Sequence, residues 1–421
     1  MLHKIPTDQI GPRADAMAQA VQTCVHCGFC LPNCPTYQVL GQESDSPRGR
    51  ILLMKHVLEG NLQAEDIQPH IDRCLGCLAC ETNCPSGVPY SSLLSPYRDL
   101  TRDQGKRSFS LKRLIALETI PYPERFRWAI RTGKIAKAFA WMIPRSLRPM
   151  LDLLPENVPE AVRSNQEVFP AQGVKRGRVA LLEGCAQRVL DPAIHQAALR
   201  VLTRNGIEVI VPKSQGCCGA LAWHVGYGNH AMDQARHNMQ VFPEDVDAIL
   251  STAAGCGSAM HEYPVLFQKS ADEHRARAFA AKCKDVLTYL DSIGIEAPPP
   301  IARPLRVAYH DACHLAHAQK ETRAPRRLLA LIPNLTMVPL SNSDLCCGSA
   351  GTYNMDQPEI AHELGQKKAK TIVDSSCDFV ALANIGCEVQ IAIHLQKLGA
   401  TRPVLHVIQV LDAAYQRHQI A

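Results

Sequence analysis

The distribution of cysteines restricts what this chain can fold into more than any other feature. The 421 residues include 18 cysteines, with eight in residues 24–84, none in 85–184 and ten in 185–387. The sequence opens without the apolar run of a secretory signal, so we expect a cytosolic protein whose cysteines stay reduced. Reduced cysteines at this density are typical of metal ligands or redox groups rather than of disulfides. The sequence therefore predicts a metal protein.

The first eight cysteines form two runs with the spacing C-x2-C-x2-C-x3-C-P. The runs are Cys24, Cys27, Cys30 and Cys34, followed by Pro35, and Cys74, Cys77, Cys80 and Cys84, followed by Pro85. Three cysteines at every third position let one loop hold three irons of a [4Fe–4S] cubane, and the fourth normally ligates the other cluster. We therefore expect one cluster on Cys24, Cys27, Cys30 and Cys84, and a second on Cys74, Cys77, Cys80 and Cys34. The pattern alone also permits each run to hold its own cluster.

Structural zinc is the main alternative for these runs, because zinc sites also use C-x2-C pairs. Zinc needs two such pairs for each site and does not account for two runs of four cysteines with a trailing proline. Two adjacent cubanes form a short electron path, which indicates electron relay rather than a structural scaffold.

Residues 178–421 contain an internal repeat. Three matched pairs of motifs carry it, namely RVALLEGC with RVAYHDAC, GCCG with LCCG, and AAGCG with ANIGC. The matched cysteines are 128, 129 and 131 residues apart, and so constant an offset indicates a duplicated domain. Short apolar runs such as VALLEG and IEVIVP alternate with helical patterns, which predicts a parallel α/β sheet in each copy.

Each copy of the repeat places four cysteines at matched positions. Copy 1 offers Cys185, Cys217, Cys218 and Cys256, and copy 2 offers Cys313, Cys346, Cys347 and Cys387. The first and last of each set fall where a predicted strand ends, which is where open parallel sheets bind their ligands. The adjacent cysteines of each copy point in different directions, so a pair can bind two irons of one cluster or form a redox-labile disulfide. The repeat therefore predicts a further iron–sulfur cluster or redox thiols.

Other polar residues flank these loops. The histidines are His224, His310, His314 and His317, and each either tunes or ligates a metal or is an ordinary polar residue in a loop. Cys283 and Cys377 lie outside the repeat and are expected to pack in the core.

A basic segment separates the two groups of cysteines. Residues 98–150 contain 13 Lys and Arg residues against four acidic residues, whereas the whole chain has a net charge of +5. The run before Pro144 predicts a helix with one apolar face and two tryptophans nearby, made of Ile135, Phe139, Met142 and Ile143 with Trp128 and Trp141. Such a helix either lies on an anionic membrane or packs on a partner or on this chain's own core. Nucleic acid is not an expected partner, because the pI of 8.4 is modest.

Taken together, the motifs resemble the iron–sulfur subunit of bacterial glycolate oxidase. The segments that carry the likeness are CVHCGFCLPNCPTYQVLG (24–41), SPRGRILLMKHVLEGN (46–61), RCLGCLACETNCPSGV (73–88), LEGCAQ (182–187), GCCGA (216–220) and LCCGSAGTY (345–353). The second half also resembles the cysteine-rich CCG domain of heterodisulfide reductase, but Ala259 and Gln390 stand where the full form has a fifth cysteine. These residues permit a four-cysteine cluster in each copy or one site shared by the copies.

The resemblance implies a subunit that receives electrons from flavin (FAD) subunits, which oxidise glycolate to glyoxylate, and passes them toward a respiratory acceptor such as a membrane quinone. It places the chain in the cytoplasm or on the cytoplasmic face of the inner membrane. No GxGxxG motif follows a strand, so the chain is not expected to oxidise a hydroxy acid alone. The alternative is a thiol–disulfide redox subunit similar to heterodisulfide reductase, in which the CCG site is catalytic.

The expected fold is α+β with several domains. A helix-rich ferredoxin domain with two clusters is expected over residues 1–100, a basic helical segment and linker over 101–177, and two α/β CCG copies over 178–300 and 301–421. Within the first domain, Ser46 and Pro47 predict the start of a helix and Gly60 predicts its end.

Overall fold

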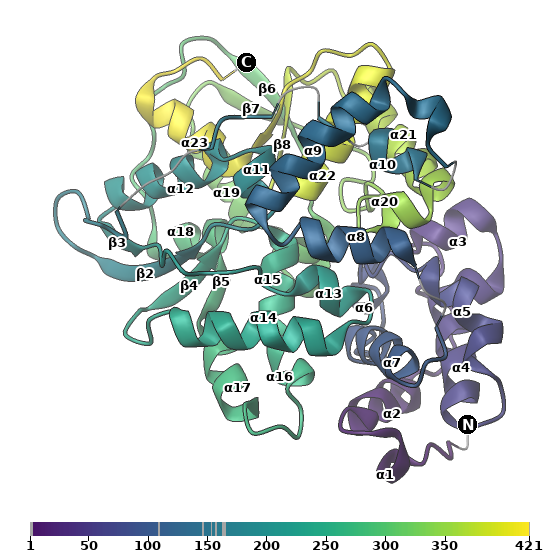
Figure 1. The fold of residues 1–421 in the computed structure, drawn as a ribbon. Coiled ribbons are helices and arrows are strands. Elements are labelled where there is room, and N and C mark those ends of the chain that lie inside the picture. Colours follow the sequence, from purple (N-terminus) through teal and green to yellow (C-terminus); the bar gives the residue numbers. More distant parts are fainter. Residues whose placement is uncertain are drawn as a thin grey trace.

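The computed structural model describes residues 3–107, 110–144, 147–152, 154–155, 158–161 and 166–420. Arg145 of the basic segment and part of the linker expected over 101–177 lie outside the described residues. The N-terminal helices occupy one side of the molecule and the two sheets the other (Figure 1).

The N-terminal part is built from short helices. They are α1 (Thr7–Ile10), α2 (Ala14–Thr23), α3 (Pro35–Leu40), α4 (Pro47–Leu58), α5 (Ala64–Asp72), α6 (Ala79–Thr82) and α7 (Ser91–Asp103), with a 3-10 turn at Glu43–Asp45. Apolar side chains from α2, α4, α5 and α7, including Met17, Met54, Ile71 and Leu93, form a hydrophobic core of their own. The first cysteine run lies between α2 and α3 and the second lies around α6, so this core holds the two loops beside each other.

Helix α4 begins where the sequence predicts it. The Ser46 hydroxyl accepts a hydrogen bond from the Gly49 amide at 3.0 Å, and Pro47 takes the first helical position. Gly60 follows the last turn with a φ of 77°, the left-handed conformation that glycine adopts with least strain. Helix α4 therefore presents its first turn to the loops that carry the cysteines.

The C-terminal half contains two sheets, one in each copy of the repeat. The first has the strand order β1-β3-β2-β4-β5 and the second β7-β6-β8-β9. The strands are β1 (Val168–Phe169), β2 (Gly177–Leu182), β3 (Ile207–Ile210), β4 (Ala248–Ser251), β5 (Cys283–Asp285), β6 (Leu305–Tyr309), β7 (Leu335–Val338), β8 (Phe379–Leu382) and β9 (Val404–His406). Among the described strands, every pairing is parallel except that of β1 with β3. The prediction of a duplicated parallel α/β domain is confirmed.

Helices cover these sheets. In copy 1 they are α11 (Gln187–Leu190), α12 (Ala193–Arg204), α13 (Ala220–His224), α14 (Gly228–Val241), α15 (Ala254–His261), α16 (Tyr263–Leu266), α17 (Glu273–Lys282) and α18 (Val286–Ile293). In copy 2 they are α19 (Ala324–Ala330), α20 (Tyr353–Asp356), α21 (Pro358–Asp374), α22 (Ile385–Lys397) and α23 (Val407–Gln416), with a π-helical turn at His314–Ala318. One hydrophobic core contains residues of both copies, among them Leu202, Leu250, Val307 and Leu411. The copies are therefore packed together rather than strung along the chain.

The cysteines of the repeat gather beyond the carboxyl ends of the strands. Cys185 and Cys313 follow β2 and β6 within four residues. Cys256 and Cys387 lie in the first turns of α15 and α22, which follow β4 and β8. Because parallel strands end at the same edge of a sheet, each copy brings its cysteines to one place.

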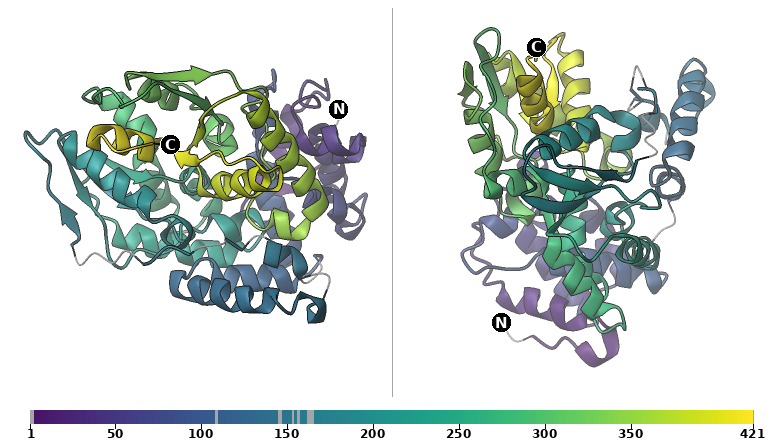
Figure 2. Two further views of the ribbon diagram at one scale, coloured as in Figure 1. Left: turned by 90° about the horizontal axis from the view of Figure 1, so that it is seen from above. Right: turned by 90° about the vertical axis from the view of Figure 1, so that its left-hand side faces the viewer.

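The basic segment forms α8 (Leu111–Thr119), α9 (Pro123–Lys137), a 3-10 turn (Ala140–Met142) and α10 (Arg148–Asp152). Figure 2 shows this blue segment at the outside of the molecule in both views. The α-helix ends at Lys137, and the chain continues into the tighter 3-10 turn before it reaches Pro144. Ile135, Phe139 and Met142 are exposed, whereas Ile143 faces a cavity. The prediction of one apolar helical face over these four residues was therefore wrong.

Part of the positive charge of this segment is neutralised inside the protein. Arg107 and Arg113 are buried and pair with Asp72, and Arg113 also pairs with Asp356 at 2.7 Å. Arg98 is buried too and donates to backbone carbonyl oxygens. The basic residues therefore divide into an internal set and an exposed set, rather than forming one surface. In the described part of the chain, the helices are too short or too polar to cross a membrane.

Candidate metal centres

The two cysteine runs exchange their last cysteines. One cavity is lined by three cysteines of the first run and the fourth of the second, which we call the outer group (Cys24, Cys27, Cys30 and Cys84). A neighbouring cavity is lined by three cysteines of the second run and the fourth of the first, which we call the inner group (Cys34, Cys74, Cys77 and Cys80). Cys80 and Tyr90 line both cavities, so the two groups adjoin. Each group offers four sulfur donors, the number that a [4Fe–4S] cubane needs.

The two groups differ in exposure, although burial raises the pKa of thiols in both. Cys27 of the outer group is exposed, whereas Cys34 of the inner group is buried. Burial raises the pKa of the Cys77 and Cys80 thiols well above the usual value. Buried thiols of this kind lose their protons when they bind a metal, because the metal ligand is the thiolate.

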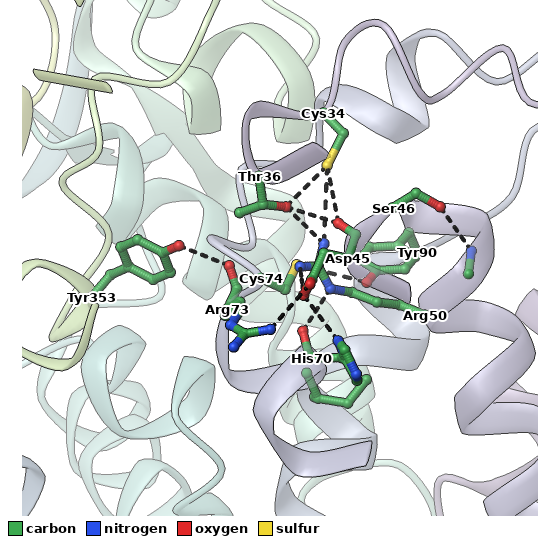
Figure 3. Close-up of polar contacts among 12 residues, drawn as sticks. Cys34, Thr36, Asp45, Ser46, Arg50, His70, Arg73, Cys74, Tyr90 and Tyr353 are labelled. Carbon is green, nitrogen blue, oxygen red and sulfur yellow. Dashed lines mark hydrogen bonds and ion pairs between the residues drawn. The ribbon is translucent and has the colours of Figure 1, made fainter. Parts of the chain in front are cut away.

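A buried arginine stands beside the inner group (Figure 3). Arg50 donates to the Thr36 hydroxyl at 3.0 Å and to the His70 carbonyl oxygen at 2.7 Å, and its Nη1 lies 3.9 Å from Cys34 Sγ. Its charge is balanced by the buried carboxylate of Asp45 at 3.3 Å. The inner group therefore has a fixed positive charge beside it, held by hydrogen bonds on several sides.

The positive charge of Arg50 acts most directly on Cys74. Burial raises the pKa of its thiol, but Arg50 and Arg98 outweigh burial and leave the pKa below its usual value. The Tyr90 hydroxyl lies 3.6 Å from Cys74 Sγ, and Asp45 also pairs with Arg73, the residue before the second run, at 3.1 Å. The surroundings of Cys74 thus favour an anionic sulfur, as a cluster ligand requires.

The Pro47–Arg50 motif at the start of α4 serves both groups. The Arg48 guanidinium donates to the His26 carbonyl oxygen at 3.1 Å, in the outer loop, while Arg50 faces the inner group. Gly49 between them lies so close to the turn before α4 that a Cβ atom would stand 2.0 Å from the Glu43 carbonyl oxygen. The motif therefore supplies one guanidinium group beside each group of cysteines. Its glycine lets α4 lie close to the preceding turn.

The four thiols of copy 1 lie next to one another. Cys185 Sγ is 3.5 Å from Cys217 Sγ, and thiol hydrogen bonds continue from Cys217 to Cys218 and from Cys218 to Cys256. Cys217 and Cys218 are buried, and the other two are half-buried. The hydrogen bond with Cys217 and burial raise the pKa of the Cys185 thiol well above its usual value. Copy 1 therefore assembles a compact set of four sulfur donors.

Copy 2 repeats this arrangement and adds a histidine. Thiol hydrogen bonds link Cys313, Cys346, Cys347 and Cys387 in the same order as in copy 1. The His310 ring and the thiols of Cys347 and Cys387 place one ligand atom each within 4.8 Å of one another. Hydrogen bonds with Cys346 and Cys387 lower the pKa of the Cys347 thiol well below its usual value, against the effect of burial.

The inner group of the ferredoxin-type part adjoins copy 2. Cys77, Cys313 and Cys346 belong to one small hydrophobic cluster. The imidazole of His314 is hydrogen-bonded to the Gly76 carbonyl oxygen at 3.0 Å, between the first two cysteines of the second run. The thiols of the two halves of the chain are therefore close together, although the sequence separates them by more than 200 residues.

A large cavity lies between the basic segment and the cysteine loops. Its volume is about 680 Å³, and apolar side chains of α8, α9 and α10 line it, including Ile115, Ile130 and Leu151. Cysteines of the inner group and of both copies of the repeat also line it, namely Cys74, Cys185, Cys217, Cys218, Cys256 and Cys313. This volume falls in the range that holds a small organic ligand.

Two histidines and a glutamate are among the polar side chains that line the same cavity, namely His224, His314 and Glu262. His224 Nε2 lies 3.5 Å from a carboxylate oxygen of Glu262, and the His224 and His314 rings meet edge-on, with centroids 5.2 Å apart. Burial raises the pKa of Glu262, but His224 outweighs it and the pKa stays below its usual value. Burial and the nearby His224 lower the pKa of His314 to about 4. The cavity therefore brings a carboxylate and two imidazoles close to thiols.

The remaining candidates have structural surroundings. His317 is hydrogen-bonded to the Thr82 hydroxyl at 3.0 Å and so links copy 2 to α6. Cys283 and Cys377 are buried in the hydrophobic cores, as predicted. Sequence reasoning missed Arg50 and Glu262; only the Pro47–Arg50 motif carried a signal for the former.

Two family models match the parts of the chain that contain these cysteines. The family model of a 4Fe–4S dicluster domain matches residues 20–88, and that of a cysteine-rich (CCG) domain matches 179–261 and 307–392. A crystal structure of a hypothetical protein from Helicobacter pylori shares the fold with a TM-score of 0.52 at 9% identity, covering 96% of this chain and 72% of that one.

Several relatives are similar along the sequence. The glycolate oxidase iron–sulfur subunit of Escherichia coli (strain K12) is 36% identical over 420 residues, which cover 96% of both chains. The probable glycolate oxidase iron–sulfur subunit of Bacillus subtilis (strain 168) is 33% identical over 92% of both chains. Lactate utilization protein A of Exiguobacterium sp. is 32% identical over 56% of this chain and 96% of its own length. With a dicluster domain followed by two CCG domains and this similarity over nearly its whole length, the chain belongs to the family of glycolate oxidase iron–sulfur subunits.

Proposed function

We propose that this chain is the electron-transfer subunit of a complex in which flavin subunits oxidise glycolate to glyoxylate, and that it passes the electrons to a membrane quinone. The observation that carries the proposal is the line of thiol groups from the exposed outer group, through the inner group, to copy 2 and the large cavity. The names of the relatives support a role in hydroxy-acid oxidation.

The outer and inner groups are proposed to hold one [4Fe–4S] cluster each. All four cysteines of each group line its cavity, and the cations of Arg48 and Arg50 lie beside the outer and inner loops respectively. These residues fit the anionic, all-sulfur coordination of a cubane. When bound, such a cluster accepts and releases one electron at a time.

The domain boundaries expected from the sequence belong to this proposal. Residues 1–100 would form the two-cluster unit, residues 178–300 and 301–421 the two CCG units, and 101–177 the segment that covers the cavity. The hydrogen bond between His314 and Gly76 supports a fixed placement of the first unit against the last.

The cavity of about 680 Å³ is the proposed binding site of the quinone. Its apolar walls suit a ring with a lipid-like tail, and His224 and Glu262 can supply and collect protons at the ring oxygens. The quinone would take up two electrons and two protons to become a quinol. The hydroxy acid supplies both electrons and releases two protons as it becomes a 2-oxo acid on the partner subunit, so the exchange balances.

The outer surface of the same segment is proposed to rest on the membrane. Between residues 123 and 142, five large apolar side chains are exposed, namely Trp128, Ile135, Phe139, Trp141 and Met142. Exposed Arg131 and Lys137 accompany them. Aromatic side chains mixed with cations are typical of a surface that binds an anionic bilayer. Because α9 lines the cavity as well, a quinone could enter from the lipid past this helix.

The function is tested in the complex reconstituted with its flavin subunits and purified without oxygen. Cys27→Ser should abolish reduction of a short-chain quinone, while reduction of the flavin by glycolate persists. Cys283→Ser is the matched control, because Cys283 is buried outside both groups, and it should retain quinone reduction. Normal quinone reduction by Cys27→Ser, or loss of flavin reduction in an intact complex, would contradict the relay. Reduction of a disulfide by the chain with reduced viologen, without quinone reduction, would favour the thiol–disulfide alternative.

The quinone site is tested separately. Ala136 lines the cavity, whereas the neighbouring Ala138 is exposed and does not line it. Ala136→Trp should raise the KM for quinone by about tenfold, because the indole fills space needed by the ligand. Ala138→Trp should leave the KM unchanged. Equal KM values in the two variants would exclude this cavity as the quinone site.

A further inference from the structure

Copy 2 of the repeat contains a buried histidine whose ring is held in one orientation. His310 follows β6 and has no exposed surface. Its Nδ1 is hydrogen-bonded at 2.9 Å to the carbonyl oxygen of Ser343, an acceptor that fixes the proton on Nδ1. Its Nε2 is buried and interacts with the thiol of Cys347 rather than with an oxygen or a backbone group. An imidazole oriented by a backbone carbonyl, with its other nitrogen facing sulfur donors, is the usual arrangement of a metal ligand.

The neighbours of His310 are the other donors that such a ligand needs. The ligand atoms of His310, Cys347 and Cys387 lie within 4.8 Å of one another, and none of the three residues is more than 2% exposed. The Asn384 amide donates to Cys387 Sγ at 3.5 Å, a contact that favours an anionic sulfur. The buried nitrogen lone pair of His310 and the two thiols are thus placed to bind one metal together.

A buried lysine also indicates negative charge at this place. Lys368 is 2% exposed, and its ammonium group donates to the backbone carbonyl oxygens of Asn342 and Ser343. The residues with which it interacts electrostatically include Cys346 and Cys347. A buried ammonium group is costly unless an anion balances it, and thiolates bound to a metal provide that anion.

The two copies differ at this position. Aligning Cys185 with Cys313 places Leu182 of copy 1 opposite His310 of copy 2. Leu182 is the last residue of β2 and is buried, but it offers no ligand atom. The nitrogen donor therefore belongs to copy 2 alone, although both copies have four matched cysteines.

From this geometry we propose that copy 2 holds a metal centre with mixed coordination, in which His310 Nε2 joins Cys347 and Cys387 as a ligand, whereas any centre in copy 1 has sulfur ligands from the protein only. One nitrogen with two sulfur donors suits either a single zinc ion or an iron of a cluster. The site itself does not depend on the proposed function. Its part in electron transfer does, because a neutral imidazole in place of a thiolate raises the reduction potential of an iron centre.

The test uses the full chain purified without oxygen, with iron and zinc measured per chain. His310→Leu installs the residue of copy 1, and it should remove the metal of copy 2 while the signals of the two N-terminal clusters remain. His310→Cys should retain the metal, with sulfur in place of nitrogen as its ligand. Zinc-edge X-ray absorption reports that change for zinc. Pulsed EPR with ¹⁵N-labelled histidine reports it for a paramagnetic iron centre.

His406→Leu is the matched control for loss of a buried imidazole. His406 is also fully buried, but its nitrogens are hydrogen-bonded to Thr252 and Ile408 and no thiol group of the repeat is among its partners. The His406→Leu variant should keep the metal of copy 2. Unchanged metal content in His310→Leu, or equal loss in His310→Leu and His406→Leu, would overturn the proposal. These readouts do not require quinone reduction, so failure of the relay would leave them interpretable.

Discussion

The imidazole of His314 meets the carbonyl oxygen of Gly76 at 3.0 Å, although 238 residues separate the two in the sequence. His314 follows Cys313 of copy 2, and Gly76 precedes Cys77 of the inner group. The contact therefore fixes two cysteine loops against each other through one hydrogen bond between half-buried residues.

Removing this hydrogen bond should weaken the packing of the N-terminal part against copy 2. His314→Ala leaves the Gly76 carbonyl oxygen without its partner, so we expect a loss of about 1–3 kcal/mol in the free energy of unfolding. The measurement is urea denaturation of the anaerobic protein. His237→Ala is the control, because His237 is exposed and bonds only to the local carbonyl oxygen of Ser214; it should cost less than about 0.5 kcal/mol. Equal losses in the two variants would mean that this packing depends on other contacts.

Arg50 should set the reduction potential of the inner cluster. Its positive charge stabilises the more negative, reduced state, so Arg50→Gln should lower the potential of that cluster. Arg48→Gln should instead lower the potential of the outer cluster, because Arg48 lies beside the outer loop. EPR-monitored redox titration of both variants measures the two potentials. If Arg50→Gln shifts neither potential, its role is confined to stability.

Gly49 should tolerate no side chain. Alanine would place Cβ 2.0 Å from the Glu43 carbonyl oxygen, so the turn before α4 must move, and we expect a loss of at least about 2 kcal/mol. Gly60→Ala adds the same methyl group where no atom lies within 4 Å, and its left-handed φ should cost only about 1–2 kcal/mol. Thermal unfolding followed by the visible absorbance of the clusters compares the two. A smaller loss for Gly49→Ala than for Gly60→Ala would refute the steric account.

The stability of the CCG half should depend on pH through His406. Burial lowers its pKa to about 4, below the value of about 6.5 in an unfolded chain. Between these values the unfolded chain binds a proton that the folded protein does not, so His406 destabilises the fold as the pH falls from about 6.5 toward 4. Asp285 acts in the opposite sense, because burial raises its pKa to about 7.

A variant separates the two effects. Asn in place of His406 can still accept the helix-capping bond from Ile408, but it does not titrate. The difference in unfolding free energy between the wild type and His406→Asn should therefore shrink in that window by at most about 1.4 kcal/mol per pH unit. Urea denaturation at several pH values measures it. A difference independent of pH would contradict the buried, neutral state of His406.

Membrane binding should depend on the two exposed tryptophans. Trp128 and Trp141 are 69% and 76% exposed, and replacing both with Glu removes apolar contact and adds like charge to an anionic surface. We expect affinity for vesicles that contain phosphatidylglycerol to fall by at least about tenfold. Val174→Glu changes an exposed apolar residue outside the basic residues 98–150 and should have no effect. Unchanged sedimentation of the double variant with vesicles would mean that this surface contacts a protein instead.

The sequence predicted those parts of the molecule that follow from spacing. The offset of 128 residues between Cys185 and Cys313 revealed the duplication, and strand ends located the cysteines, because both depend on local order along the chain. The end of α9 was misplaced, since the apolar pattern continued into a 3-10 turn. The partners of Arg107 and Arg113 could not be predicted, because Asp72 and Asp356 lie in distant segments that only packing brings to them.

The exchange of Cys34 and Cys84 between the runs makes the N-terminal part indivisible. Each thiol set is completed by a cysteine from across the intervening helices, so a cut between the runs would break both sets at once. One cysteine run without the other does not supply a complete set of four thiols. Both runs must therefore be synthesised before the sets are complete. Because the runs interlock, neither set of four thiols can assemble until both runs are folded against each other.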